Sequence, residues 1–313
     1  MTDQRGDGTP AAPIDISICV ATHNRAERLG PLIERTLALG GARIELVIVN
    51  DGSSDATPEV LEASAAQHPD RLTWDSIVHS GRGAALNRAF DLARGDFILL
   101  LDDDDSIEAD ALADILQTWN SIPLSERDNF CGVCGLATRM DGTLIGDQFP
   151  TSPMDSDFFT ARIIKRLRGD KREVFRRAAL GDWRFPVAPG EYRVATNLLW
   201  FELAARYKAR FVNRVWLRKD YLPGGITANG LRNKVRSARL TAHYNATALR
   251  LFPRMPWWAK FRFSLDYARY ATHARLPLGE RLAVLGSGPL GRILVFAGAV
   301  VARRDLRRLG ARS

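Results

Sequence analysis

The most unusual chemistry in this sequence is a run of four carboxylates directly after an apolar stretch. Residues 97–107 read FILLLDDDDSI, so Asp102, Asp103, Asp104 and Asp105 follow a segment typical of a buried strand. Neighbouring carboxylates repel one another at neutral pH, and an ionised carboxylate away from water is costly. A divalent cation relieves that repulsion, because Mg²⁺ and Mn²⁺ prefer oxygen ligands and bind carboxylates together with substrate phosphates. The run therefore predicts a metal–diphosphate site.

The same acids can instead serve a helix. Asp105 or Ser106 can cap the N-terminus of a helix that begins near Glu108, and we expect Asp105 to do some capping. A cap needs fewer acids than this run supplies, so capping alone does not account for the cluster.

The elements that position this run are strands alternating with helices. Apolar runs typical of buried strands span residues 14–22, 44–51 and 72–79, before the run at 97, with helical periodicity between them. This order predicts an α/β fold with a mostly parallel twisted sheet and helices on both faces. Ligands bind beyond the carboxyl ends of such strands. Polar clusters follow these ends, namely Thr22–Arg25, Asn50–Ser53 and the four acids.

Beyond the acids the order of elements is more varied. The predicted elements are a hairpin over 131–149 that turns at Asp141–Gly142, helices over 157–168 and 198–207, a strand over 209–222, and basic helices from about 230. Cys131 and Cys134 fall in the hairpin, and one such pair without further ligands indicates a buried strand rather than a zinc or redox site. The glycine motif at 286–291 has no surrounding βαβ unit and is interpreted as a loop.

Several segments together resemble the family 2 glycosyltransferases, inverting enzymes with the Rossmann-like A-type glycosyltransferase fold. The segments are ICVATHNRAERL, VNDGSSDAT, LLLDDDDSI, GDKREVF, RFPVAPGEYRVATNLLW, YKARFVN and DYLPGGITAN. The resemblance covers about residues 14–230 and depends on their order and spacing. It implies a metal-dependent transferase that moves a sugar from a nucleotide-sugar, in the first place a UDP-sugar, to a glycan or lipid-linked acceptor in bacterial cell-surface polysaccharide synthesis.

The resemblance also implies roles for single residues. Asp51 should accept the uracil N3–H of UDP, since an acceptor-only carboxylate suits an imide N–H. Thr22, Asn24 and Arg25 should lie near the base and diphosphate. Asp102 and Asp103 should join the nucleotide site, and Asp102 and Asp104 should hold Mn²⁺ or Mg²⁺, with Asp104 the principal ligand.

The sequence departs from the family pattern at three positions. Asn50 replaces the first acid of the second-strand pair, and Leu86 stands where many members carry an arginine. The related enzymes carry a glutamate general base where this chain has Thr196, which cannot deprotonate a hydroxyl at neutral pH. Glu191 is the first substitute and Asp170 the second, and either can instead be a surface acid.

Composition and charge bound the rest of the chain. We expect a flexible lead-in over 1–13, a catalytic domain over 14–230 and a basic helical region over 231–313, with the nucleotide half of the domain at 14–106 and the acceptor half at 107–230. Three cysteines give no disulfide framework and the first residues no secretory signal, so a cytoplasmic protein is expected.

The positive charge is concentrated at the C-terminal end. Residues 241–313 carry 13 Lys and Arg against three acids, which leaves residues 1–240 nearly neutral. Basic helices with tryptophan lie on anionic membrane surfaces, so 252–313 predicts peripheral contact with the inner membrane face. The alternative is a helical hairpin packed on the catalytic domain.

Two other functions remain possible from the sequence. A noncatalytic nucleotide-sugar-binding or scaffold protein fits the degenerate base position, and the pI of about 9.7 suggests a nucleic-acid-binding protein. The second ranks lower and no nucleic-acid partner is expected, because the bases lie outside the sheet and no binding motif is visible.

Overall fold

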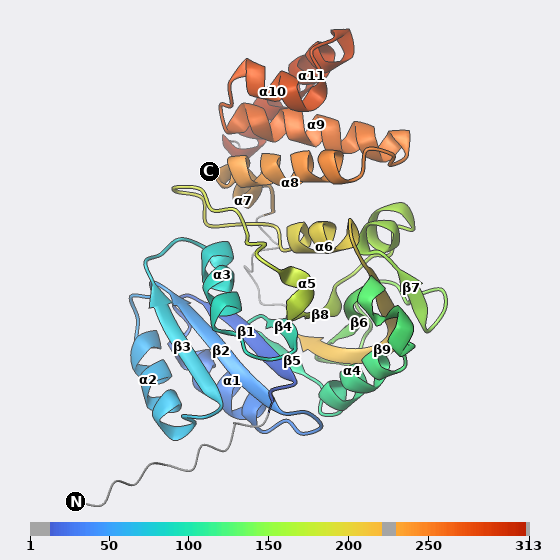
Figure 1. The fold of residues 1–313 in the computed structure, drawn as a ribbon. Helices are drawn as coiled ribbons and strands as arrows, with labels where there is room; N and C mark the ends of the chain where they lie inside the picture. Colours follow the sequence, from blue (N-terminus) through green and yellow to red (C-terminus); the bar gives the residue numbers. More distant parts are fainter. Residues whose placement is uncertain (1–12, 221–229, 311–313) are drawn as a thin grey trace, which may run out of the picture.

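The computed structural model describes residues 13–220 and 230–310, and its centre is one nine-stranded sheet (Figure 1). The strand order is β3-β2-β1-β4-β8-β6-β9-β5, and β7 also pairs with β9. Helices cover both faces, so the predicted α/β fold class is confirmed. The parallel pairing predicted for most of the sheet holds among the first four strands, and the second half is mixed.

The parallel half contains the four predicted strands. They are β1 (Ile16–Thr22), β2 (Ile44–Asp51), β3 (Leu72–Ile77) and β4 (Phe97–Leu101). The helices between them are α1 (Ala26–Leu37), α2 (Thr57–Gln67) and α3 (Arg82–Leu92). Thr22 pairs with Asn50, so the carboxyl ends of β1 and β2 lie side by side.

The second half of the sheet begins after the acids. Its strands are β5 (Asp105–Ile107), β6 (Phe130–Arg139), β7 (Met154–Ser156), β8 (Lys171–Arg176) and β9 (Lys208–Lys219). Parallel neighbours need a long crossover connection, and only Asp102–Asp104 separate β4 from β5. Strand β5 therefore turns away from β4 and pairs with β9.

Helices of this half pack around the mixed strands. They are α4 (Ala111–Asn120), the 3₁₀ turn η1 (Leu124–Asn129), the π-helical turn η2 (Thr160–Ile164), α5 (Arg177–Leu180) and α6 (Asn197–Ala204). The hairpin turn at Asp141–Gly142 is present, with Thr138 bridged to Leu144. The helix predicted over 157–168 is reduced to a short helical segment that includes η2.

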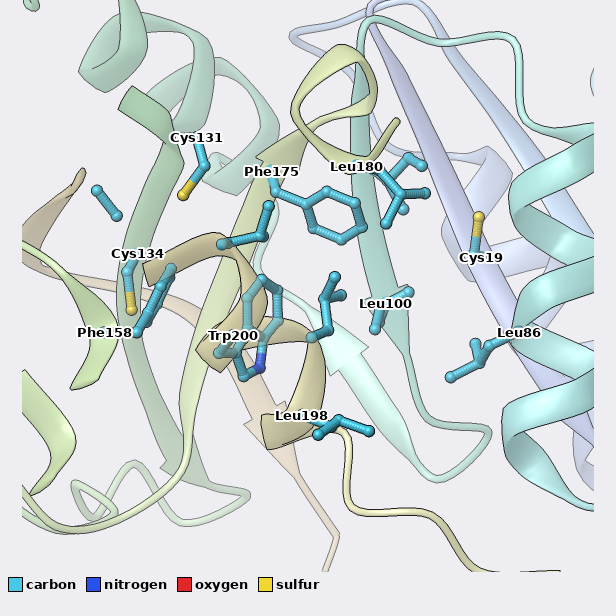
Figure 2. Close-up of a cluster of buried hydrophobic side chains, with 14 of the residues drawn as sticks. Cys19, Leu86, Leu100, Cys131, Cys134, Phe158, Phe175, Leu180, Leu198 and Trp200 are labelled. Atoms are coloured by element: carbon cyan, nitrogen blue, oxygen red, sulfur yellow. The ribbon is translucent and has the colours of Figure 1, made fainter. Parts of the chain in front are cut away.

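The sheet separates two apolar clusters. Ile18 of β1 belongs to the cluster under α1 and α4, whereas Cys19 belongs to the cluster under α3 (Figure 2). Cys131 and Cys134 of β6 are free and buried in that second cluster, as the buried-strand interpretation predicts. Burial raises the pKa of Cys131 to about 12, which leaves its thiol unreactive.

The C-terminal helices form a layer beyond α6 (Figure 1). They are α7 (Gly230–Arg236), α8 (Ala238–Leu251), α9 (Trp257–His273), α10 (Leu278–Leu285) and α11 (Pro289–Gly310). The glycine motif at 286–291 connects α10 to the first turn of α11. Within the described residues, no helix has both the length and the apolar character needed to span a bilayer.

Helix α9 is covered by two neighbouring helices, α8 and α11. Its buried residues include Phe263, Tyr267 and Ala268, whereas Phe261 is 54% exposed.

Candidate active site

The carboxyl ends of β1 and β4 meet at one edge of the sheet, because both strands are parallel and paired in register. The Thr22 hydroxyl donates to Asp103 Oδ2 over 3.3 Å. Arg25 Nε lies 3.5 Å from the same oxygen. Burial raises the pKa of Asp103, Arg25 opposes the rise, and the neighbouring acids of the run add to it. Three residues predicted for the nucleotide site are thus brought together.

Asp102, Asp104 and Asp105 form a compact carboxylate group beside this contact. Each offers a carboxylate oxygen within 4.8 Å of the others. Asp105 is fully buried, and its Oδ1 has no hydrogen-bond partner in the described part of the chain. Asp104 is half-buried and has no ion pair or hydrogen bond within residues 13–220 and 230–310. Three carboxylates at this spacing, two of which carry unpartnered oxygens, suit a hard divalent cation.

Three cations from distant parts of the chain approach the same group. Lys219, at the end of β9, places Nζ 3.1 Å from Asp105 and 3.6 Å from Asp102. Arg172 of β8 lies 3.3 Å from Asp105, and Arg82 of α3 forms an ion pair with Asp102. These contacts offset the repulsion among the carboxylates.

The pKa values of the two paired acids shift in opposite directions. Burial raises the pKa of Asp105 to about 6, and Lys219 and Arg172 only limit the rise. Burial also favours a higher pKa for Asp102, but its three nearby cations outweigh burial and the net pKa falls below its usual range. The cluster therefore combines one firmly ionised carboxylate with one that titrates closer to neutral pH.

The cap expected from Asp105 is wrong. Asp105 opens β5 and pairs across to Lys219, while α4 starts at Ala111 with Asp110 in the N-cap position. The chain stays extended through Ile107 because the edge of β9 supplies backbone partners for it.

Arg82 supplies a cation near the position where the sequence lacked one. Leu86 replaces the arginine of many family members, and it is buried in the apolar cluster shown in Figure 2. Arg82 lies one helical turn earlier on α3, and positions four apart share a helix face. Arg82 therefore lies on the same face of α3 as Leu86, and its ion pair with Asp102 was not foreseen from the sequence.

Asp51 fixes the backbone that leads into α3. Its carboxylate accepts hydrogen bonds from the N–H groups of Ser80 (2.7 Å) and Gly81 (2.9 Å), and it is 4% exposed. Gly81 has φ of 90°, and a Cβ there would meet the Tyr192 carbonyl oxygen at 2.4 Å. His79 Nδ1 lies 3.0 Å from Asp51 Oδ2. The predicted base-reading residue thus shapes the β3–α3 turn.

Aromatic rings line this turn. His79 stacks between His23 and Tyr192, with ring centroids 4.3 and 4.2 Å apart. Asn24 has φ of 53°, and its Oδ1 accepts a hydrogen bond from the Ser54 N–H over 2.8 Å. Asn24 therefore ties the β1–α1 and β2–α2 turns together.

A pocket of about 170 Å³ opens beside the carboxylate group. Its lining includes Arg82, Asp102, Arg162, Asp170, Glu173, Thr196, Asn197, Trp200 and Lys219. Asp170, one of the two predicted bases, places Oδ2 3.4 Å from Lys219 Nζ. Thr196, the position at which the resemblance implies a base, lines the same pocket.

Glu191, the other predicted base, has a different position. Its two oxygens accept hydrogen bonds from the backbone N–H groups of Arg239 (2.9 Å) and Leu240 (2.8 Å), in the first turn of α8. Glu191 is not part of the lining of the 170 Å³ pocket. Its contacts are those of a helix-capping carboxylate, which satisfies orphan N–H groups and the positive end of the helix dipole.

Glu173 is an acid of the pocket that sequence reasoning missed. Burial raises its pKa, and Arg162 and Arg172 oppose the rise. Arg162 NH1 is itself buried without a hydrogen-bond partner in the described residues. The signal for it in the sequence was a glutamate inside the strand pattern KREVF. An acid within such a strand is unusual and indicates a carboxylate that faces a site.

The fold matches that of solved transferases. The Staphylococcus aureus TarS 1-349 structure with UDP-GlcNAc aligns with a TM-score of 0.56 at 17% identity, over 94% of this chain and 92% of that one. The mannosyltransferase PcManGT of Pyrobaculum calidifontis, solved with GDP-Man and Mn²⁺, gives a TM-score of 0.53 at 21% identity, over 94% and 81%. These likenesses define the A-type transferase class of fold.

The first half of the sequence identifies the family. Residues 17–168 match the model of glycosyl transferase family 2, and this part of the chain belongs to that family. The putative glycosyltransferase EpsH of Bacillus subtilis (strain 168) is 36% identical over 110 residues, 35% of this chain and 30% of EpsH. The succinoglycan biosynthesis protein ExoO of Rhizobium meliloti (strain 1021) is 34% identical over 103 residues, 33% of this chain and 29% of ExoO. The matched segment thus spans less than a third of either relative.

Proposed function

We propose that this chain is a metal-dependent inverting glycosyltransferase that moves a sugar from a UDP-sugar to a glycan or lipid-linked acceptor in bacterial cell-surface polysaccharide synthesis. The carboxylate group at the end of β4, inside a family 2 domain and beside a pocket, carries the proposal. The printed names of the relatives, among them a succinoglycan biosynthesis protein, support a glycan product. Similar folds solved with UDP-GlcNAc and GDP-Man support a nucleotide-sugar donor.

The acids of the site fit Mn²⁺ or Mg²⁺. Asp104 and the unpartnered oxygen of Asp105 offer free ligand positions, and Asp102 lies within reach of both. A bound divalent cation would neutralise charge on the leaving diphosphate. Arg82 and Lys219 reach the same acids, so their charges also lie where a diphosphate would be held.

The nucleotide would lie along the ends of β1 and β2. Thr22 and Arg25 both contact Asp103 there, and Asn24 holds the turn. Asp51 Oδ2 accepts from the Gly81 N–H and lies 3.0 Å from His79 Nδ1, so a base N–H that binds this oxygen would compete with His79 for the space.

Asp170 is the proposed general base. It lies in the pocket with Asp102, and its Oδ2 forms an ion pair with Lys219 Nζ. Its side chain is 48% exposed, so an acceptor hydroxyl can approach it. Glu173 is the second candidate, because its raised pKa suits a group that takes up a proton.

A donor panel tests the proposal. Purified protein is incubated with UDP-, GDP- and TDP-sugars in Mn²⁺ or in EDTA, and release of free nucleoside diphosphate is measured. We expect release from a UDP-sugar in Mn²⁺ and its loss in EDTA. Nucleotide binding without turnover of any donor would favour a noncatalytic nucleotide-sugar-binding protein, the candidate that Thr196 in the pocket supports.

Peripheral contact with an anionic membrane from the cytoplasmic side is part of the proposal. Leu290, Ile293 and Phe296 of α11 are between 62% and 71% exposed, and Arg292 lies among them. Exposed apolar side chains beside arginines suit an anionic lipid surface.

Vesicle cosedimentation tests this contact. Changing Leu290, Ile293 and Phe296 together to Ser should release the protein from phosphatidylglycerol vesicles. The exposed Leu124 of η1 changed to Ser is the matched control. Equal binding by the triple variant and the control would support packing of the helices without a membrane role.

A further inference from the structure

A second pocket lies between the loop that precedes α6 and the helical layer. It measures about 440 Å³ and shares Arg82, Thr196 and Asn197 with the first pocket. Tyr192–Ala195 and Asn233 of α7 complete its lining. The two pockets thus meet at the position where the proposed transfer would occur, and the second one is the larger.

Arg193 places a positive charge in the wall of this second pocket. Its backbone N–H donates to Ser237 Oγ over 3.2 Å, which fixes the loop against the start of α8. Its guanidinium is half-buried and has no hydrogen bond or ion pair in the described part of the chain. An arginine remains charged at any physiological pH, and a desolvated charge without a partner is costly. Such a side chain in a pocket wall points to an anionic ligand.

The charges around the pocket agree with an anion. Its lining contains two arginines and no acid among the described residues. The acids Asp102, Asp170 and Glu173 belong to the lining of the first pocket only. Arg82 is paired with Asp102, whereas Arg193 has no acid to pair with. The two cations therefore differ, and Arg193 is the one available to a ligand.

We propose that this second pocket binds the acceptor and that the acceptor carries a phosphate group, held by Arg193, near the hydroxyl that receives the sugar. The inference rests on the proposed function and names the substrate class of that site. A guanidinium binds phosphate through two parallel hydrogen bonds. Tyr192, 48% exposed, and Val194 offer apolar surface for the carbon skeleton next to the phosphate.

Calorimetry on the full chain with saturating UDP and Mn²⁺ tests the proposal. Glycerol 1-phosphate is titrated against glycerol, and dodecyl phosphate serves as the lipid-like probe. The variants are Arg193→Gln and Arg193→Lys, and the control is Arg239→Gln. Arg239 is an exposed arginine at the start of the neighbouring helix α8 and is absent from the lining of either pocket, so its loss changes the net charge equally.

We expect glycerol 1-phosphate to bind and glycerol not to bind. Arg193→Gln should weaken phosphate binding by about 10- to 100-fold, the effect of losing a charged hydrogen-bond partner, with Arg193→Lys intermediate and Arg239→Gln unchanged. If dodecyl phosphate binds more tightly than glycerol 1-phosphate, and Arg193→Gln weakens its binding by the same factor, the phosphate belongs to a lipid. If the two phosphates bind equally, it belongs to a soluble polymer.

Equal affinity of wild type and Arg193→Gln for glycerol 1-phosphate would overturn the inference. Binding of glycerol as tight as that of glycerol 1-phosphate would also overturn it. The UDP titration in the same samples separates this failure from a failure of the proposed function. Normal metal-dependent UDP binding with no role for Arg193 removes the phosphate inference alone. Loss of UDP binding in the wild type removes both.

Discussion

Two aspartates in this molecule are equally buried but differ in how many of their carboxylate oxygens have a partner. Asp105, at the sheet edge, is 0% exposed and Asp305, on α11, is 1% exposed. Asp305 accepts two hydrogen bonds from Arg269 (2.6 and 2.7 Å) and one from His273 (3.0 Å). Both of its oxygens are therefore used. Asp105 is paired with cations through one oxygen only, and the other has no partner in the described residues.

The pKa values of the two acids follow from this difference. Burial favours a higher pKa for Asp305, but the bonds from Arg269 and His273 outweigh it and the net pKa is lowered. Burial dominates at Asp105 and raises its pKa to about 6. A buried acid that is fully bonded indicates a structural staple, here between α9 and α11. A buried acid with one unpartnered oxygen inside a group of acids is typical of a ligand-binding site.

The largest expected effect concerns the pocket beside the carboxylate group. Asp170→Asn keeps the size of the side chain but removes its ability to take a proton, so turnover should fall by about 10²–10⁴-fold, the usual contribution of a general base. UDP affinity should change less than turnover, because the residues proposed to hold the base lie at the ends of β1 and β2. UDP-release kinetics at several donor concentrations measure both. If Asp170→Asn stays near wild-type turnover while Glu173→Gln does not, the base is Glu173.

The pH dependence of unfolding distinguishes the two acids by sign. The lowered pKa of Asp305 means that its contribution to stability is present above about pH 4 and is lost as the pH falls further. The pKa of Asp105 rises from 3.8 to about 6, so the native state binds more protons between these values and stability falls as the pH rises through them. The second effect should reach about 3 kcal/mol.

Urea unfolding from pH 3 to 7 in EDTA checks these signs. Asp105→Asn should gain stability relative to wild type as the pH rises from about 4 to about 6. Asp305→Asn should lose stability relative to wild type above about pH 4, and the loss should shrink in more acidic solution. Parallel curves for the two variants would mean that the two aspartates do not differ as described.

The smallest effect is expected at Glu191. Glu191→Gln removes the charge that caps the first turn of α8, so the free energy of unfolding should fall by about 1 kcal/mol. Turnover should stay close to wild type, since both oxygens are bound to the Arg239 and Leu240 N–H groups. Chemical denaturation and UDP release on the same protein measure the two quantities. A 100-fold loss of turnover would return Glu191 to the list of bases.

The strand ends were predictable from the sequence because they depend on local patterns. Apolar runs that stop at polar residues located β1, β2 and β4, and a parallel sheet brings such ends to one edge. The acid run and its neighbours Thr22 and Arg25 followed from that rule alone. The family resemblance itself is confirmed by the family match over residues 17–168.

The partners of these acids were not predictable, because they depend on long-range packing. Arg82, Arg172 and Lys219 come from α3, β8 and β9, and no local pattern pairs them with Asp102 or Asp105. Glu191 and Asp170 looked alike as loop acids, and only the placement of α8 and β9 separates them.

Titration of UDP by calorimetry, with Mn²⁺ and with EDTA, tests the claim that the carboxylate group is a metal–nucleotide site. The wild type should bind UDP at least about 10-fold more tightly in Mn²⁺, since even outer-shell changes at metal sites cost 10- to 100-fold. Asp104→Ala should lose this gain while its circular dichroism spectrum stays unchanged, because Asp104 has no partner within the described residues. The same Mn²⁺ gain in Asp104→Ala and wild type would contradict the account.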